Sequence, residues 1–299
     1  MIIKIFLVTL HKDIYFMIGN YKVKMYIPGG RRQYMELLLP QLFRNNGFEH
    51  VDEIMILNNA RKNSDKEYID SLNGTNKIVV YKTDNVTGSF NYICDFYRNT
   101  CDEDTIYIKI DDDIVFIDDN LIETLLKAKI SKPDSFCIFP ITINNAFSNC
   151  VLKHFGKEYV DFPNIPQPLE YHDFPSDYLY ESNEGATKCH NNFFETYPHL
   201  DKYMFDDCYS FAKSRMSINC ICYWGGDFKK IFNDGHDLRN DEQVITRKYP
   251  QMYNKFNCLI GTALCCHYSF GFQHLNDDLL EGYRKIEKQR LALYQNNNS

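Results

Sequence analysis

The sequence predicts an α/β fold in which helices cover both faces of a mostly parallel, doubly wound sheet. Three observations support this fold class. Short apolar runs of strand length alternate with segments whose apolar side chains recur at helical spacing. Polar or glycine-rich turns separate the two kinds of segment. The 299 residues are 44% hydrophobic and 24% charged, which is a globular composition that can bury a full core.

The first half of the chain shows the alternation most clearly. Residues 21–27 form an apolar run, Pro28-Gly29-Gly30 breaks it, and apolar side chains at helical spacing follow in residues 31–45. This order is the strand-helix-strand rhythm of a parallel sheet. The same criteria give strands at 1–10, 51–57, 77–82, 106–110 and 114–117, and helices at 67–72, 89–98 and 119–129.

The second half of the chain is less regular. An apolar strand at residues 136–143 leads into Asn144-Asn145. Residues 159–207 are rich in proline and aromatic side chains and lack periodicity, so we expect a functional loop or lid there. Strands follow at 216–224 and 258–266, and helices at 240–249 and 277–294.

Three adjacent carboxylates, Asp111-Asp112-Asp113, follow the expected strand at residues 106–110. Ligands of open α/β sheets bind at the carboxyl ends of the strands, which is where these acids stand. Adjacent carboxylates repel one another unless a cation neutralises them, and oxygen ligands favour hard cations such as Mg²⁺ or Mn²⁺. The sequence therefore predicts a divalent metal site, with a solvated acidic turn as the alternative.

Charge and cysteine content limit the expected partners and compartment. The formal net charge is -7 and no long basic block is present, so nucleic acid is not the expected partner. Neither Cys220-x-Cys222 nor Cys265-Cys266 has zinc-site spacing, which favours free thiols in the cytoplasm. No run approaches the roughly 20 apolar residues of a membrane span, and His11 ends the first apolar run too early for a signal peptide.

Six short motifs occur in one order along the chain: Ile27-Pro28-Gly29-Gly30-Arg31, Ile110-Asp111-Asp112-Asp113-Ile114-Val115, Ile143-Asn144-Asn145-Ala146, Ser217-Ile218-Asn219, Asp241-Glu242 and His267-Tyr268-Ser269-Phe270-Gly271-Phe272-Gln273. Together they resemble the nucleotide-sugar-dependent glycosyltransferases of the GT-A fold. More narrowly, they resemble a sparsely characterised subfamily found in microbes, fungi and large DNA viruses.

The resemblance implies a single GT-A catalytic domain over residues 1–299, Rossmann-like, with three α/β/α layers and a mostly parallel mixed sheet. Residues 1–130 would form the nucleotide-binding half, and residues 131–275 the acceptor and catalytic half. Residues 276–299 would form a terminal helix and tail. The implied activity is transfer of a sugar from a nucleoside-diphosphate sugar to a glycan, protein or small-molecule acceptor.

The same resemblance implies roles for the three acids and a late histidine. Asp111-Asp112-Asp113 resembles the DXD motif, in which the last acid, here Asp113, binds the metal. Asp111 would bind ribose or metal-bound water, and Asp112 the nucleotide or the donor sugar. His267 resembles the second metal ligand, with a hydrogen-bonded core histidine as the alternative. The implied cofactor is Mn²⁺ or Mg²⁺ on a UDP- or GDP-linked donor, because a Lewis acid stabilises charge on the leaving phosphate.

Asp241-Glu242 resembles the xED motif of inverting enzymes, in which one acid deprotonates the acceptor hydroxyl. A carboxylate at the start of a helix is kept ionised by the helix dipole, which suits a general base. Glu242 is the favoured base and Asp241 the second choice, because the pair reverses the commoner Glu-Asp order. Both acids could instead be ordinary helix caps.

Residues at three strand ends are expected to contact the nucleotide. Pro28-Gly29-Gly30-Arg31 stands where a GT-A fold meets the nucleoside, and the Arg31 guanidinium suits a diphosphate. Asn58 and Asp84 follow successive strands and are expected at the base and the ribose. Ordinary strand-end capping explains either residue alone.

Further polar and aromatic groups are expected at the donor sugar or the acceptor. Asn144-Asn145 would face one of these ligands, or would satisfy turn backbone. Trp224-Gly225-Gly226-Asp227 would place glycine backbone and the Asp227 carboxylate against the donor sugar, with a β-turn as the alternative. The aromatic rings of residues 159–207 suit an acceptor sugar.

Two other functions remain open from the sequence alone. A sugar-nucleotide pyrophosphorylase has a similar sheet, metal-binding carboxylates and a glycine-arginine turn. Those enzymes carry a longer glycine-rich loop that ends Gly-Thr-Arg. The segment Pro28-Gly29-Gly30-Arg31 lacks the length and the threonine of that loop. The second alternative is a non-enzymatic module that binds a metal or a glycan, although the twelve-residue calcium loop with its terminal glutamate is absent.

Overall fold

A computed structural model of the chain describes residue 18 and residues 20–82, 90–99, 101–162, 167–168, 178–236 and 240–297. The strand expected at residues 1–10 and the candidate ribose ligand Asp84 lie outside these residues. Within the described parts, no helix has both the length and the apolar character that crossing a membrane requires. All eleven cysteines are free thiols, and nine of them are buried.

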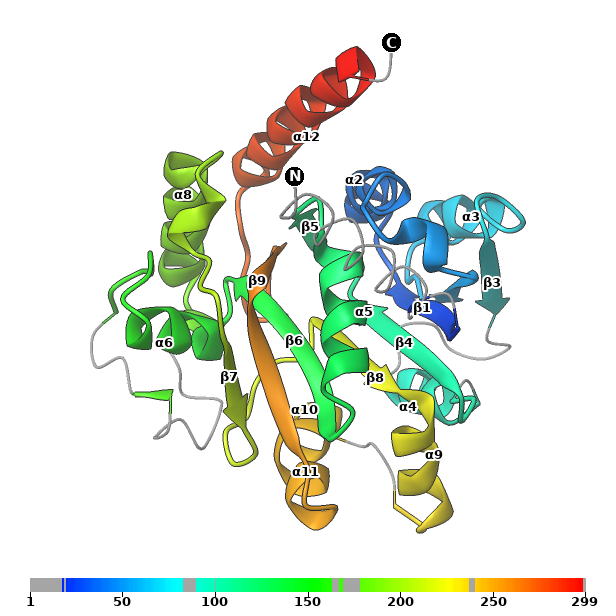
Figure 1. Cartoon of the computed structure of the whole chain (residues 1–299). Coiled ribbons are helices and arrows are strands. Elements are labelled where there is room, and N and C mark those ends of the chain that lie inside the picture. Colours follow the sequence, from blue (N-terminus) through cyan, green and yellow to red (C-terminus); the bar gives the residue numbers. More distant parts are fainter. Residues whose placement is uncertain are drawn as a thin grey trace, which may run out of the picture.

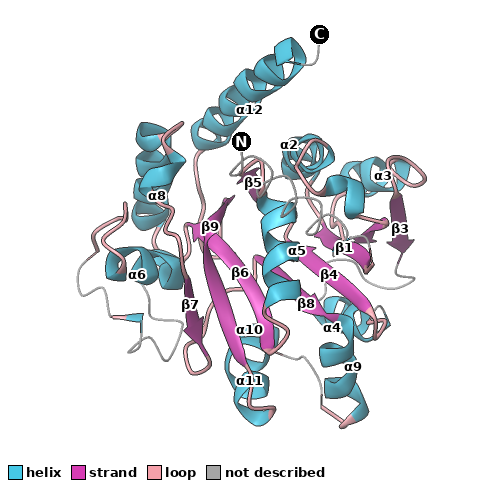
Figure 2. Ribbon diagram, in the orientation of Figure 1, coloured by secondary structure: helices cyan, strands magenta, loops and turns pink. Residues whose placement is uncertain are grey.

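A mixed sheet forms the centre of the described molecule, with helices around it (Figure 2). Its strand order is β3-β2-β1-β4-β8-β6-β9-β5, and β7 pairs with β9 on the side of this path. The strand bounds are β1 Lys22–Gly29, β2 Glu53–Asn58, β3 Ile78–Lys82, β4 Thr105–Ile110, β5 Ile114–Ile117, β6 Ser135–Ile143, β7 Cys208–Phe211, β8 Cys220–Trp224 and β9 Phe256–His267.

The sheet combines a parallel half with antiparallel strands. The strands β1, β2, β3 and β4 run parallel to one another, and so do β6 and β9. Strand β8 is antiparallel to both of its neighbours, and β5 and β7 are antiparallel to β9. The fold class predicted from the sequence, a layered α/β domain, is therefore present.

Helices cover the sheet, as α5 does where it crosses one face in Figure 1. The helix bounds are α2 Arg32–Phe43, α3 Asn63–Ser71, α4 Phe90–Asn99, α5 Leu121–Ser131, α6 Ala146–His154, α7 Tyr178–Glu181, α8 Asn183–Thr196, α9 Gly225–Asn233, α10 Asp241–Gln243, α11 Tyr249–Met252 and α12 Asp277–Asn297, with the short η1 Phe48–His50 and η3 Leu200–Lys202 and the π-helical η4 Val244–Lys248.

The sheet separates two apolar cores, because successive side chains of a strand point to opposite faces. On β4, Ile106 and Ile108 belong to one core, which also contains apolar side chains of α2 and α5. Tyr107 belongs to the other core, with Phe96 of α4 and Phe228 of α9. A three-layer arrangement follows, and the carboxyl ends of the central strands are left for ligands.

Part of the stretch expected to be irregular, residues 159–207, is helical. Helix α8 begins at its N-cap Ser182, whose side chain accepts a hydrogen bond from the Gly185 amide. Its composition is poor for a helix, and packing stabilises it instead, since His190 and Phe193 are fully buried. The sequence also missed α6, which follows Asn145 directly.

The strand register brings distant segments to one edge of the sheet. Gly29 of β1 lies opposite Asn58 of β2, and β4 runs parallel to β1 and ends at Ile110. Because β8 is antiparallel, its first residue, Cys220, lies opposite Ile110. Strand β9 ends at His267 on the same edge, where it pairs with the residue after the acids. The acids, the glycine turn and the late histidine therefore share one edge.

Candidate active site

A cleft of about 740 Å³ opens at this edge of the sheet. Segments from seven separate parts of the chain line it. Of the residues proposed from the sequence, the cleft brings together Pro28, Gly30, Arg31, Asp111, Asp112, Asp113, Glu242 and His267. A volume of this size is typical of sites that bind small molecules.

Asp112 is tied to the glycine turn. Its carboxylate accepts a hydrogen bond of 2.8 Å from the Gly30 amide and forms an ion pair with the Arg31 guanidinium through both oxygens. The Asp112 side chain is only 5% exposed, whereas that of Arg31 is 45% exposed. Asp112 therefore joins the loop before α2 to the acidic turn, and its oxygens are engaged within the protein.

Asp113 meets two cationic or potentially cationic groups at one oxygen. Its Oδ2 lies 2.9 Å from Arg31 Nη2 and 3.3 Å from His267 Nε2. Burial raises the pKa of Asp113, but Arg31 and His267 outweigh burial and hold this pKa below its ordinary value. Asp113 is therefore a buried carboxylate that stays ionised.

Asp113 and His267 fit a metal held by two side chains. Two ligands of one octahedral ion at about 2.1 Å lie roughly 3 Å apart, close to the 3.3 Å between Oδ2 and Nε2. His267 Nδ1 is buried without a hydrogen-bond partner, so the outer hydrogen bond common to ligating histidines is missing. The Phe270 ring packs against the imidazole instead, at 4.4 Å between centroids.

Among the described residues, no three side chains of His, Cys, Asp or Glu are grouped as a metal site. Mg²⁺ is commonly bound by one or two carboxylates together with substrate phosphates and water. The donor set therefore suits an ion that arrives with a diphosphate, rather than a closed structural metal site.

Asp111 is held by a lysine and an asparagine. Lys109 Nζ lies 2.5 Å from Asp111 Oδ1 and also donates 2.6 Å to the Ile218 carbonyl. The Asn219 amide donates 3.4 Å to Asp111 Oδ2, and the Asp111 backbone N–H donates to the Asn219 carbonyl. Burial raises the pKa of Asp111, and the charge of Lys109 opposes that rise.

Glu242 and Asp241 occupy different surroundings. Glu242 lines the cleft, and its Oε2 lies 3.0 Å from Arg215 Nη2. Asp241 is only 8% exposed, and its carboxylate accepts the Glu242 backbone N–H at 2.8 Å. Burial raises the pKa of Asp241 to about 7. Of the two acids, Glu242 is the one that faces the space where a substrate would lie.

Several residues expected at the nucleotide or the donor sugar lie elsewhere. The Asn58 amide donates to the Lys66 carbonyl at 3.0 Å and to Asp70 at 2.8 Å, so it fixes α3. Gly29 does not line the cleft, because a Cβ there would lie 3.0 Å from Ile56 and 3.1 Å from Met35. Both positions serve packing in this structure.

The segment Trp224-Gly225-Gly226-Asp227 is not beside the acids. Trp224 lies opposite Ile106, at the end of β4 remote from Asp111. Gly225 begins helix α9, and a Cβ there would lie 2.1 Å from the Asp102 carbonyl. Asp227 pairs with Lys255 at 2.6 Å. The segment therefore lies apart from the acids, because β8 runs antiparallel, and its contact with the donor sugar stays a prediction.

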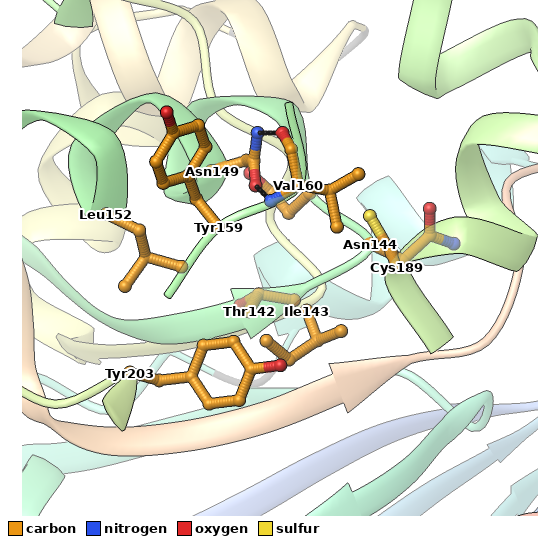
Figure 3. Close-up of a pocket in the computed structure, with 10 residues that line it drawn as sticks. Thr142, Ile143, Asn144, Asn149, Leu152, Tyr159, Val160, Cys189 and Tyr203 are labelled. Atoms are coloured by element: carbon orange, nitrogen blue, oxygen red, sulfur yellow. Dashed lines mark hydrogen bonds between the residues drawn. The ribbon is translucent and has the colours of Figure 1, made fainter. Parts of the chain in front are cut away.

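Asn144 and Asn145 do not line the cleft. They line a separate cavity of about 10 Å³, beside the Asn149 side chain that pairs with the Val160 backbone (Figure 3). Asn144 donates to the Tyr268 carbonyl at 2.9 Å, and Asn145 caps α6 by accepting the Ser148 amide. Both side chains therefore form hydrogen bonds within the protein.

The aromatic rings of residues 159–207 that the structure describes pack largely into the core. Phe193, Tyr203 and Phe205 are at most 6% exposed. The expectation that this stretch binds an acceptor stays a prediction for the residues outside the described ranges. Among the residues of this stretch that the structure describes, none lines the cleft.

The structure adds residues to which sequence reasoning gave no role. The sequence could have indicated a role for Lys109, because a lysine in the otherwise apolar strand at residues 106–110 needs a buried partner. The only indication for Asn219 was its place in the motif Ser217-Ile218-Asn219, and no local sequence pattern indicated a role for Arg215. The cleft is also lined by Arg32, Gln33, Asn59, Arg61, Lys62, Asp65, Ile93, Ser269, Phe270 and Gly271.

Comparison with known proteins bears on the fold. No family model and no curated protein matches the sequence. The crystal structure of GalNAc-T7 with UDP, GalNAc and Mn²⁺ aligns with a TM-score of 0.52 at 11% identity, over 85% of this chain and 44% of that chain. This chain thus spans less than half the length of GalNAc-T7.

Two nucleotide-handling enzymes also align. One is 4-diphosphocytidyl-2C-methyl-D-erythritol synthase from Anaerococcus prevotii, with a TM-score of 0.46 and 11% identity over 91% of this chain and 98% of that chain. The other is CMP:2-keto-3-deoxy-manno-octonic acid synthetase with CTP, with a TM-score of 0.45 and 13% identity over 90% and 99%. These weaker likenesses decide nothing about the chemistry. The likeness to GalNAc-T7 confirms the fold, which is the GT-A type of glycosyltransferases in a single domain.

Proposed function

We propose that this protein is a metal-dependent, inverting glycosyltransferase that uses a UDP- or GDP-linked sugar as its donor. One observation carries the proposal. The DXD-like acids, His267, Glu242 and the Gly30-Arg31 turn come from distant parts of the sequence and line one cleft in a GT-A fold. A fold alone hosts many activities, so we infer the function from this grouping of side chains.

Asp113 and His267 would hold Mn²⁺ or Mg²⁺. When bound, such an ion acts as a Lewis acid and stabilises the negative charge that grows on the diphosphate leaving group. Of the three acids, Asp111 has the most exposed side chain, at 22%, and it would orient the ribose. Arg31 supplies a second positive charge at the diphosphate end.

Glu242 would act as the general base. It accepts the proton of the acceptor hydroxyl while the acceptor oxygen bonds to the anomeric carbon, and the anomeric C–O bond breaks with its electron pair leaving on the diphosphate. Arg215 Nη2 lies 3.0 Å from Glu242 Oε2 and holds this carboxylate at the edge of the cleft. Attack from the side opposite the leaving group inverts the anomeric centre.

A panel assay tests the proposal. The protein is incubated with UDP- and GDP-sugars and Mn²⁺, and release of free nucleoside diphosphate is measured with and without hydroxyl acceptors. Metal-dependent release that is lost on chelation supports the proposal. A parallel reaction with nucleoside triphosphate and sugar 1-phosphate is followed for pyrophosphate. Pyrophosphate release without donor cleavage would identify a nucleotidyltransferase, and inactivity in both reactions would leave a binding module.

A further inference from the structure

We propose that Arg31 is a counterion of the acidic turn and that a bound metal ion takes its place at Asp113. In the ligand-free protein its guanidinium neutralises Asp112 and Asp113; on metal binding it leaves Asp113 and pairs with the donor diphosphate. The inference rests on the metal site of the proposed function. It adds that metal and nucleotide bind cooperatively. Metal binding releases Arg31 from Asp113, and the diphosphate then pairs with the released guanidinium.

The shared oxygen is the central observation. Arg31 Nη2 lies 2.9 Å from Asp113 Oδ2, and His267 Nε2 lies 3.3 Å from the same oxygen. An ion held between Asp113 and His267 uses this oxygen as a ligand. A guanidinium N–H and a divalent cation compete for the same lone pairs, so Arg31 must yield when the ion binds.

The charge balance of the acidic turn also favours release of Arg31 from Asp113 when a metal ion binds. Lys109 already pairs with Asp111 at 2.5 Å, which leaves Asp112 and Asp113 to the single positive charge of Arg31. Adding a divalent ion reverses the sign of this group and repels the guanidinium. A diphosphate restores the balance and gives the displaced arginine a bidentate partner.

Exposure shows which group can move. The Arg31 side chain is 45% exposed, whereas those of Asp112, Asp113 and His267 are at most 5% exposed. Asp112 stays anchored by the Gly30 amide at 2.8 Å, and the Asp113 carbonyl accepts the Tyr268 amide at 2.9 Å. The acids and the histidine are therefore enclosed, and Arg31 is the member of the cluster that has room to move.

Mn²⁺ binding tests the inference without any sugar donor. Electron paramagnetic resonance of free Mn²⁺ gives the dissociation constant for the wild type, Arg31→Gln, Arg32→Gln and Asp113→Asn, each with and without UDP or GDP. Arg32 also lines the cleft but pairs with Glu36 at 2.7 Å, so Arg32→Gln is a matched loss of charge. Thermal unfolding confirms that each variant is folded.

Without nucleotide, Arg31→Gln is expected to bind Mn²⁺ about tenfold more tightly than the wild type, since a competing charge is removed. Arg32→Gln is expected to change the affinity less than about threefold, because its charge is exposed and screened. Nucleotide is expected to tighten Mn²⁺ binding more in the wild type than in Arg31→Gln.

Unchanged or weaker Mn²⁺ binding by folded Arg31→Gln would overturn the inference while leaving the metal site intact. Persistence of Mn²⁺ binding in Asp113→Asn would instead overturn the metal site of the proposed function. If Arg31→Gln does not fold, the wild type decides: equal Mn²⁺ affinity with and without nucleotide contradicts the exchange.

Discussion

Asp113 Oδ2 and His267 Nε2 lie 3.3 Å apart, and the two residues stand on backbone segments that pair with each other. Strand β5 pairs with β9 so that Ile114 lies opposite His267, and the Tyr268 amide donates to the Asp113 carbonyl. The side chains proposed as metal ligands are thus positioned by sheet register before any ligand binds. Such preorganisation lowers the cost of binding.

Replacing the histidine tests its role as a ligand. We expect His267→Gln to weaken Mn²⁺ binding by at least about 10- to 100-fold, the range seen when even outer-shell partners of a metal are lost. The measurement is the Mn²⁺ dissociation constant by paramagnetic resonance. His274→Gln, a change at an exposed histidine, serves as the control. Equal Mn²⁺ binding by both variants would assign His267 to the core instead.

Removing the charge of Glu242 separates binding from chemistry. We expect Glu242→Gln to bind the donor as the wild type does and to lose about 100- to 10,000-fold in transfer rate, the usual contribution of a general base. Donor affinity by calorimetry and transfer by release of nucleoside diphosphate provide the two readouts.

Asp241→Asn is the matched control for this variant. Asp241 is buried behind Glu242 and does not line the cleft, so we expect transfer to fall less than about tenfold through altered positioning alone. Full transfer by Glu242→Gln together with an inactive Asp241→Asn would move the role of base to Asp241.

Gly225→Ala distinguishes packing from a sugar contact. Its Cβ would lie 2.1 Å from the Asp102 carbonyl and 2.8 Å from the Tyr107 ring, so we expect a loss of about 3 kcal/mol in the free energy of unfolding. Gly271→Ala meets nothing within 4 Å and should change stability by less than about 0.5 kcal/mol. A stable Gly225→Ala with weaker donor binding would favour the sugar contact after all.

Acid is expected to destabilise the protein through His190. Burial lowers the pKa of His190 to about 4, while its Nδ1 and Nε2 contact the Tyr283 hydroxyl and the Tyr268 carbonyl at 2.7 and 2.8 Å. The unfolded chain binds this proton near pH 6.5 and the folded protein does not, so stability falls as pH drops, by about 3 kcal/mol from about pH 7.5 to about pH 4.

Urea unfolding of the wild type and of His190→Gln over this pH range checks the prediction. Every other titrating group is common to the two proteins, so their difference isolates His190. The stability advantage of the wild type should shrink as the pH falls. A difference that does not vary with pH would show that His190 does not titrate as its burial implies.

The sequence could predict that the main candidate residues share one edge, because the ends of strands can be recognised in an α/β sequence. The apolar run at residues 106–110 ends at the acids, and the run before His267 ends on the same edge. Parallel strands put such ends together, so the grouping of Asp113 with Gly30 could be predicted. The long strand-helix alternation made the fold class accessible for the same reason.

The errors have physical causes that the sequence does not display. Strand direction is set by tertiary pairing, and the antiparallel course of β8 carries Trp224 to the opposite edge from the acids. Helix α8 is stabilised by burial rather than by propensity. The pairing of Arg31 with Asp112 and Asp113 joins two turns that are distant in the sequence, and no local pattern encodes it.

The most direct test of the account is Mn²⁺-dependent cleavage of a nucleoside-diphosphate sugar by the wild type and by Asp113→Asn, with Asp65→Asn as a carboxylate control in the same cleft. We expect the wild type and Asp65→Asn to release nucleoside diphosphate, and Asp113→Asn to lose at least about 100-fold in rate, since a metal contributes several kcal/mol. Equal rates for all three proteins, or no cleavage of any UDP- or GDP-linked donor, would contradict it.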